Sequence, residues 1–194
     1  MQLPKTQHPK LYFHDRIMRL VVLPFIPDAI QPNHVTALRF LLTPVVIWAL
    51  FVENYAFGVP LFLITAFTDA LDGSLARVRN KITPWGIFFD PVADKLLIGS
   101  VAILLGLKYY HPAIIFAALL LDILPSLRWA STRYAGTVMM ANIWGKLKMF
   151  LQFVSFFCLI LGLALGVPEL IAVGEAILAV SLAFALVAVI TYSL

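Results

Sequence analysis

The chain has 194 residues, of which 62% are hydrophobic and only 12% are charged. Soluble domains carry about 25% charged residues, so this composition excludes an ordinary soluble enzyme and indicates a membrane protein. The net charge is +4, and Cys158 is the single cysteine and lies in an apolar run, which excludes a disulfide framework and a cysteine-based metal site.

The first predicted element is an amphipathic helix over Leu11–Leu23, within an N-terminal segment of residues 1–30. Apolar residues such as Phe13 and Ile17 are interspersed there with Arg16 and Arg19. A helix of this kind is expected to lie in the membrane interface and not to cross the bilayer. The two arginines interrupt the apolar stretch, so we do not expect a secretory signal peptide.

Residues 31–194 are predicted to form a single domain of six transmembrane helices, which makes the fold class an all-α membrane protein. About 20 apolar residues are needed to cross a bilayer, and the shorter runs reach this length through their polar ends. The apolar runs are Val35–Val52, Gly58–Phe67, Ile87–Leu107, Ala113–Leu127, Met149–Val167 and Leu170–Ile190.

The basic residues predict the orientation of these helices. With a cytoplasmic amino terminus and six crossings, every lysine and arginine except Lys108 falls on or near the inner side. Membrane proteins carry their excess of lysine and arginine on the cytoplasmic side. We therefore expect a protein of the cell (inner) membrane with both termini in the cytoplasm, whose positive charge does not indicate nucleic-acid binding.

Four carboxylates stand near the inner ends of the second and third predicted helices. Asp69 and Asp72 are three residues apart and Asp90 and Asp94 are four apart, so each pair shares a helix face. A short connection makes the helices antiparallel neighbours, and the two faces can meet. An acid within a membrane segment costs roughly 2.5–3.5 kcal/mol on insertion scales, so four of them indicate a function. Converging carboxylates repel one another, and one or two hard divalent ions relieve that repulsion.

Small residues and an arginine accompany the acids. Gly73 and Ala76 leave one side of the second helix open beside Asp72, and Arg77 lies one turn beyond Gly73. An arginine in that position can bind a phosphate. The set predicts a site for a phosphorylated substrate at the inner membrane face. A divalent-cation transporter is the alternative class, since paired intramembrane acids also form ion pathways, although transport sites usually lie near the midplane.

The segment from Asp69 to Asp94 resembles the signature of the CDP-alcohol phosphatidyltransferase family, Asp-x2-Asp-Gly-x2-Ala-Arg-x8-Gly-x3-Asp-x3-Asp, at every fixed position. The resemblance implies transfer of a phosphatidyl group from CDP-diacylglycerol to an alcohol, with release of CMP. It implies that Asp69, Asp72 and Asp90 bind Mg²⁺ or Mn²⁺, with two ions expected. Asp94 would touch the metal and act as the general base.

The same resemblance implies which residues contact the CDP-lipid. Gly73, Ala76 and Arg77 belong to the signature. Residues 31–39 resemble the segment with which the family begins its first helix, and they supply further donor-site candidates. The weaker candidates for the donor site are Asn33 and Thr36 of this segment, together with Thr83 before the third predicted helix, and helix capping is an equally good alternative for all three.

The acceptor is predicted from four basic residues around the fourth connection, namely Arg128, Arg133, Lys146 and Lys148. Four bases suit an acceptor that carries a phosphate, and positive-inside topology alone is the alternative. Residues 145–152 resemble a segment of the family's phosphatidylglycerophosphate synthases, although Met149 replaces a threonine. We therefore expect sn-glycerol 3-phosphate as the acceptor, with inositol phosphate and phosphatidylglycerol as alternatives. A homodimer is also expected, with Gly162-x3-Gly166 as a candidate contact.

Overall fold

The computed structural model describes residues 18–20, 22–27, 30–79, 81, 83–134 and 143–191. Throughout these ranges the regular secondary structure is helical, and they contain no strand. The predicted interfacial helix over Leu11–Leu23 lies mostly outside the described residues. Its last part is followed by a single 3₁₀ turn, η1 (Leu23–Phe25).

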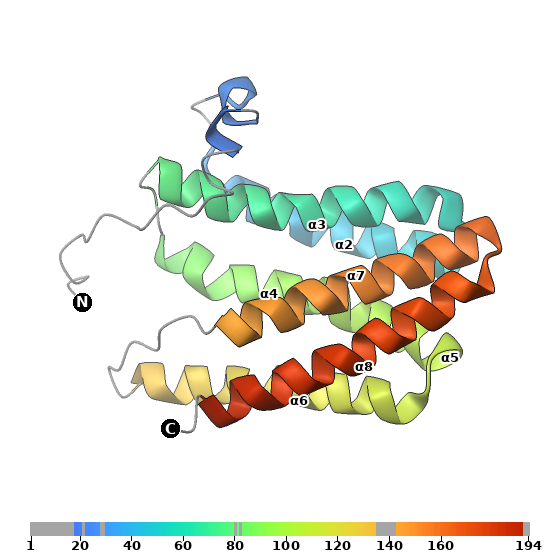
Figure 1. Cartoon of the computed structure of the whole chain (residues 1–194). Coiled ribbons are helices and arrows are strands. Elements are labelled where there is room, and N and C mark those ends of the chain that lie inside the picture. Colours follow the sequence, from blue (N-terminus) through green and yellow to red (C-terminus); the bar gives the residue numbers. More distant parts are fainter. Residues whose placement is uncertain are drawn as a thin grey trace. The chain divides into compact units, whose positions relative to one another are not determined.

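Helices occupy each of the predicted apolar runs (Figure 1). The third run is a continuous helical stretch in which a π-helical turn, η2, separates α4 from the short α5. The helical elements are α2 (Pro32–Phe51), α3 (Tyr55–Val78), α4 (Pro84–Val101), η2 (Ala102–Gly106), α5 (Leu107–Tyr109), α6 (Pro112–Tyr134), α7 (Ile143–Leu165) and α8 (Pro168–Thr191).

Four of the described helices, α2, α3, α7 and α8, are long and apolar enough to cross a membrane. The apolar part of α6 is shorter and covers Pro112–Ile123. An all-α architecture is therefore confirmed for the described residues, whereas six crossings stay a prediction.

Proline and glycine set the ends of several helices. A proline stands at the first position of α2, α4, α6 and α8, where its fixed φ suits a helix and its missing N–H is not needed. Gly166 follows α7 with a φ of +67°, a left-handed conformation that glycine adopts without strain. The amide of Val167 then donates to the carbonyl of Gly162 at 2.9 Å, which closes the end of the helix.

The chain divides into two compact units, the first comprising Met1–Val45 and Leu61–Asp94 and the second Val46–Pro60 and Lys95–Leu194. In the first unit Leu23, Val35 and Leu75 form a small buried core. Arg79 ties the chain before α2 to the end of α3. Its guanidinium donates to the main-chain carbonyls of Ile26 at 2.7 Å, Ile30 at 2.9 Å and Pro27 at 3.2 Å.

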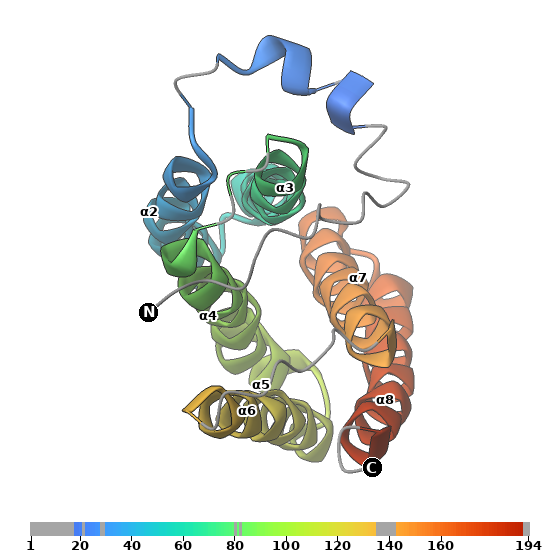
Figure 2. The same ribbon diagram turned by 90° about the vertical axis from the view of Figure 1, so that its left-hand side faces the viewer.

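In the second unit α7 and α8 form an antiparallel hairpin and lie side by side in both views (Figures 1 and 2). Gly162 permits this approach, because a Cβ there would stand 2.9 Å from Cγ1 of Ile171. The Tyr110 hydroxyl donates to the carbonyl of Ser155 at 2.9 Å and joins the start of α6 to α7. Gly162 is thus used within the hairpin, whereas Gly166 ends α7, and the expected homodimer stays a prediction.

Candidate active site

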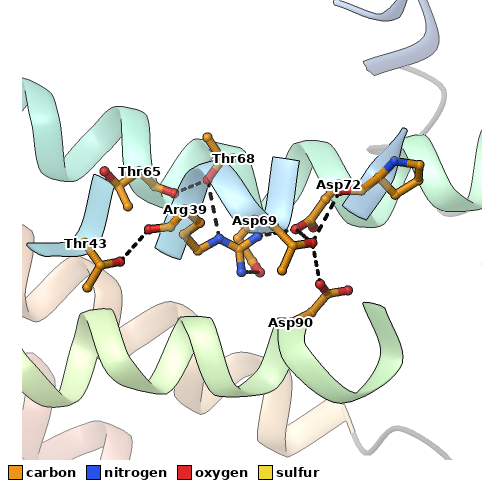
Figure 3. Close-up of polar contacts among 9 residues, drawn as sticks. Arg39, Thr43, Thr65, Thr68, Asp69, Asp72 and Asp90 are labelled. Carbon is orange, nitrogen blue, oxygen red and sulfur yellow. Dashed lines mark hydrogen bonds and ion pairs between the residues drawn. The ribbon is translucent and has the colours of Figure 1, made fainter. Parts of the chain in front are cut away.

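Helices α2, α3 and α4 of the first unit bring polar side chains together at one point (Figure 3). The Thr36 Oγ1 of α2 lies 3.1 Å from the Asp72 Oδ2 of α3 and 2.7 Å from the Asp90 Oδ1 of α4. It also lies 3.3 Å from the carbonyl of Pro32 in its own helix. Asp72 is only 2% exposed. Asp72 and Asp90, one from each predicted acid pair, therefore lie against the same hydroxyl, and their role as metal ligands stays a prediction.

Arg39, one turn after Thr36 on α2, carries the opposite charge into this cluster (Figure 3). Its side chain is 0% exposed, and its Nη2 donates to Asp72 Oδ2 at 2.5 Å. Its Nη1 forms an ion pair with Asp69 Oδ1 at 2.7 Å, and its Nε donates to Thr68 Oγ1 at 3.4 Å. The guanidinium thus joins the two acids of α3.

From the sequence, Arg39 was expected to be an inward-facing basic residue at the end of the family-like segment 31–39, and it was not among the predicted site residues. A signal was present, because Thr36 and Arg39 are spaced i, i+3 and share a helix face. A basic residue in an otherwise apolar run also requires a partner, since burying an unpaired charge is costly. Its partners, however, lie about thirty residues further along the chain, where the sequence does not identify them.

The hydrogen-bond acceptors around Thr36 outnumber the protons that Thr36 can donate to them. The Thr36 hydroxyl has one proton but lies against two carboxylates and a main-chain carbonyl. Asp69, Asp72 and Asp90 together carry three negative charges, which the one guanidinium of Arg39 only partly balances. Oxygen ligands with an excess of two negative charges suit a hard divalent cation.

The ligand geometry of such an ion is not preformed. Among the described residues, no group of three or more His, Cys, Asp or Glu side chains has an arrangement that could hold a metal ion as it stands. The residues therefore fit a divalent ion in donor type and charge, while two of the carboxylates are engaged by Arg39. Asp94, half-buried and one turn after Asp90 on α4, stays a predicted ligand and base.

Thr83, Asn33 and Gly86 form the rim of the same cluster. The Thr83 hydroxyl accepts a hydrogen bond from the main-chain amide of Gly86 at 3.0 Å, and this contact caps α4. The same hydroxyl donates to the Asn33 Oδ1 at 2.6 Å. The capping alternative is thus realised for Thr83. A Cβ on Gly86 would stand 3.2 Å from the Thr83 Oγ1 and 3.5 Å from the Asp90 Oδ2. Glycine therefore keeps the main chain of α4 close to the acids.

The predicted donor residues of α3 lie next to one another. A Cβ on Gly73 would stand 3.3 Å from the Arg77 Nη1, so the guanidinium of Arg77 lies over the glycine. Gly73, Ala76 and Arg77 are all half-buried. The small residues thus provide room beside α3, and Arg77 is the side chain that lies in it.

The predicted acceptor residues belong to the second unit, where the main chain of α6 carries Arg128 and Arg133, whose side chains lie outside the described part of the structure. Lys146 is exposed near the start of α7. Lys148 is 8% exposed, forms an ion pair with Asp122 of α6 and donates to the carbonyl of Leu121 at 3.1 Å. The contact between Lys148 and Asp122 was not predicted from the sequence.

Residues 29–188 match the CDP-alcohol phosphatidyltransferase family, and the chain belongs to that family of enzymes. The resemblance seen in the signature is thereby confirmed. Enzymes of this family use divalent metal ions.

Individual relatives are named CDP-diacylglycerol–glycerol-3-phosphate 3-phosphatidyltransferase. The protein of that name from Rickettsia felis is 37% identical over 158 residues, which cover 78% of this chain and 86% of the relative. The one from Wigglesworthia glossinidia brevipalpis is 29% identical over 138 residues, covering 66% and 75%. The one from Bacillus subtilis is 34% identical over 110 residues, which cover 54% of each.

Proposed function

We propose that this protein transfers the phosphatidyl group of CDP-diacylglycerol to sn-glycerol 3-phosphate, releasing CMP and forming phosphatidylglycerophosphate. The observation that carries the proposal is the meeting of Asp69, Asp72 and Asp90 around Thr36 and Arg39, which brings signature acids of both helices together. The names of the relatives support this donor and this acceptor.

Asp69, Asp72, Asp90 and Asp94 would hold one or two divalent ions, Mg²⁺ or Mn²⁺. Bound there, the ions would neutralise the diphosphate of the donor and stabilise the CMP that leaves. Thr36 assists by restraining Asp72 and Asp90, because its hydroxyl lies between their carboxylates.

Asp94 is the proposed general base. Its carboxylate accepts the proton of the acceptor hydroxyl, and the oxygen attacks the phosphorus that carries diacylglycerol. The bond from that phosphorus to the oxygen of CMP breaks, and CMP leaves with the electron pair. Asp94 stands one helical turn after Asp90, which places a proton acceptor next to a proposed metal ligand.

The donor would lie against the small residues of α3. Gly73 and Ala76 let its nucleotide or phosphates approach the helix, and Arg77 supplies a positive charge beside them. Asn33, Thr36 and Thr83 are polar groups at the same cluster and complete the proposed donor site.

The acceptor phosphate would be bound by basic residues of the second unit. Arg128, Arg133 and Lys146 are the first candidates. Lys148 is a weaker candidate, because its charge is matched by Asp122.

The proposed topology has six membrane crossings with the site and both termini on the cytoplasmic side of the inner membrane, and an interfacial helix before the first crossing. The distribution of basic residues supports it. Lys108, which this topology places outside, pairs with Glu53 at 2.7 Å, and both side chains are more than half exposed.

The test is CMP release by the purified protein in detergent with CDP-diacylglycerol, Mg²⁺ or Mn²⁺, and acceptors supplied one at a time. We expect CMP and phosphatidylglycerophosphate with sn-glycerol 3-phosphate, and CMP release slowed by about 10²-fold or more in the Asp94→Asn control. Release of CMP with inositol phosphate or phosphatidylglycerol instead would support the transfer reaction and refute the proposed acceptor. If the protein binds Mn²⁺ but releases no CMP with any acceptor, the proposed enzymatic activity is refuted and cation transport is favoured.

A further inference from the structure

We propose that Arg39 competes with a divalent cation for the carboxylate of Asp69, while it keeps its contact with Asp72, and so sets how tightly the site binds metal. Arg39 is a positioning residue in this account, since it acts through the acids and not on the substrate. The inference rests on the metal site of the proposed function and adds to it a residue with a defined effect on affinity.

Among the residues that the structure describes, the acids that form ion pairs with Arg39 are Asp69 and Asp72, which both belong to the site. The Arg39 side chain is fully buried on a helix apolar enough to cross a membrane. A buried charge of this kind is held by its counter-ions, because removing them would leave it unpaired in an apolar surrounding. The same oxygens are those that a metal ion would need.

The two contacts of the guanidinium are unequal. Nη2 makes a hydrogen bond with Asp72 at 2.5 Å, and Asp72 is 2% exposed. Nη1 is buried and lies 2.7 Å from Asp69 Oδ1, yet it has no hydrogen-bond partner, and Asp69 is 46% exposed. The pair with Asp69 is therefore held by charge and is the more exposed of the two contacts. A cation that enters from the exposed side of the site reaches Asp69 before Asp72 and can replace Nη1 there without breaking a hydrogen bond.

Two contacts of the Arg39 guanidinium remain when a cation displaces it from Asp69. Its Nε donates to Thr68 Oγ1 at 3.4 Å, and the Thr68 hydroxyl donates its own proton to the carbonyl of Thr65 at 2.6 Å. Thr68 can therefore continue to accept from Arg39, and Asp72 can continue to hold Nη2. The exchange needs a movement of one carboxylate and one nitrogen, and it leaves α2 and α3 in place.

The charge balance predicts the direction of the effect. Arg39 cancels one of the three negative charges of Asp69, Asp72 and Asp90, so a variant without this charge presents a more negative site to a cation. One unit charge a few ångströms away is worth at least tenfold in affinity even with strong screening. Arg39→Gln should therefore bind Mn²⁺ roughly tenfold more tightly than the wild type, or better.

The experiment is titration of Mn²⁺ alone, followed by electron paramagnetic resonance, on the full chain in detergent at pH 8. The variants are Arg39→Gln, which removes the charge, and Arg39→Lys, which keeps it. Lys81→Gln is the matched control, because it removes a positive charge at an exposed position of the same unit. We expect tighter binding in Arg39→Gln alone. Thermal melting should show the same variant least stable with EDTA and most strongly stabilised by Mn²⁺.

Equal or weaker Mn²⁺ binding by Arg39→Gln, with the wild type binding normally, would overturn the inference and leave the proposed function intact. The inference would also be overturned if Arg39→Gln did not fold at saturating Mn²⁺ while Arg39→Lys did. The metal ion would then not replace the charge of the arginine. No Mn²⁺ binding by the wild type would overturn the proposed metal site, and the inference with it.

Discussion

The ion pair between Lys148 of α7 and Asp122 of α6 is a buried charge pair in an apolar pair of helices, with the two side chains 8% and 17% exposed. Gln152, one turn after Lys148, donates its amide to both Asp122 oxygens at 3.2 Å. Removing one member of a buried pair leaves the other uncompensated, which costs about 3–5 kcal/mol. We predict that Lys148→Met and Asp122→Leu each lower the free energy of unfolding by this amount.

The double variant Asp122→Leu/Lys148→Met should be far less damaged than the sum of the two changes. It leaves neither of these two charges buried, and its cost includes the Gln152 amide without its acceptor and the Leu121 carbonyl without the Lys148 donor, about 1–3 kcal/mol for each group left unsatisfied. The coupling between the two sites should therefore amount to several kcal/mol. The assay is denaturant unfolding in mixed micelles, followed by circular dichroism, for the wild type, both single variants and the double variant.

The same double variant tests the role of Lys148 in catalysis. If the charge of Lys148 is committed to Asp122, the folded double variant should keep its KM for sn-glycerol 3-phosphate within about twofold, whereas Lys146→Ala should raise it tenfold or more. Additive losses of stability would refute the structural reasoning. A tenfold rise of the acceptor KM in the double variant, with an unchanged donor KM, would show that Lys148 binds the acceptor phosphate.

Three further changes test the site and the hairpin. Thr36→Val removes the hydroxyl between Asp72 and Asp90, and it should cost about 1–3 kcal/mol of stability in EDTA, with less loss in Mg²⁺; melting curves equal to those of the wild type would contradict this. Gly162→Leu should lower stability by about 1–3 kcal/mol in denaturant unfolding, whereas Gly99→Ala, where the nearest atom to a new Cβ is 4.0 Å away, should cost much less. Asp94→Asn should slow CMP release by about 10²- to 10⁴-fold while Mn²⁺ still binds, and normal turnover would remove it as the base.

The positions of the helices followed from local patterns. The apolar runs and the prolines that begin α2, α4, α6 and α8 are visible in the sequence, and they set where helices form. The π-helical turn at Ala102–Gly106 was not predictable, because it accompanies close packing against α6 and α7. A Cβ on Gly106 would stand 2.6 Å from Cδ1 of Ile115. Such a contact depends on tertiary structure and leaves no periodic signal.

The site was predictable where its residues occur at fixed spacing. The separation of the acid pairs predicted that Asp72 and Asp90 meet, and Thr36 was already a candidate. Arg39 was missed because membrane topology alone accounts for an arginine near the inner face. The partner of Lys148 was missed for a similar reason, since a basic residue is explained by topology until its contact with a distant helix is seen.

Arg79 donates three hydrogen bonds to main-chain carbonyls of the chain before α2, those of Ile26, Pro27 and Ile30. Carbonyl oxygens are common to all residues, so these three hydrogen bonds do not depend on which side chains those positions carry. Substitutions at Ile26 or Pro27 can therefore leave them intact, whereas replacing Arg79 removes all three together. In related proteins these three positions can differ in sequence while the chain keeps the same hydrogen bonds, provided that an arginine remains at the end of α3.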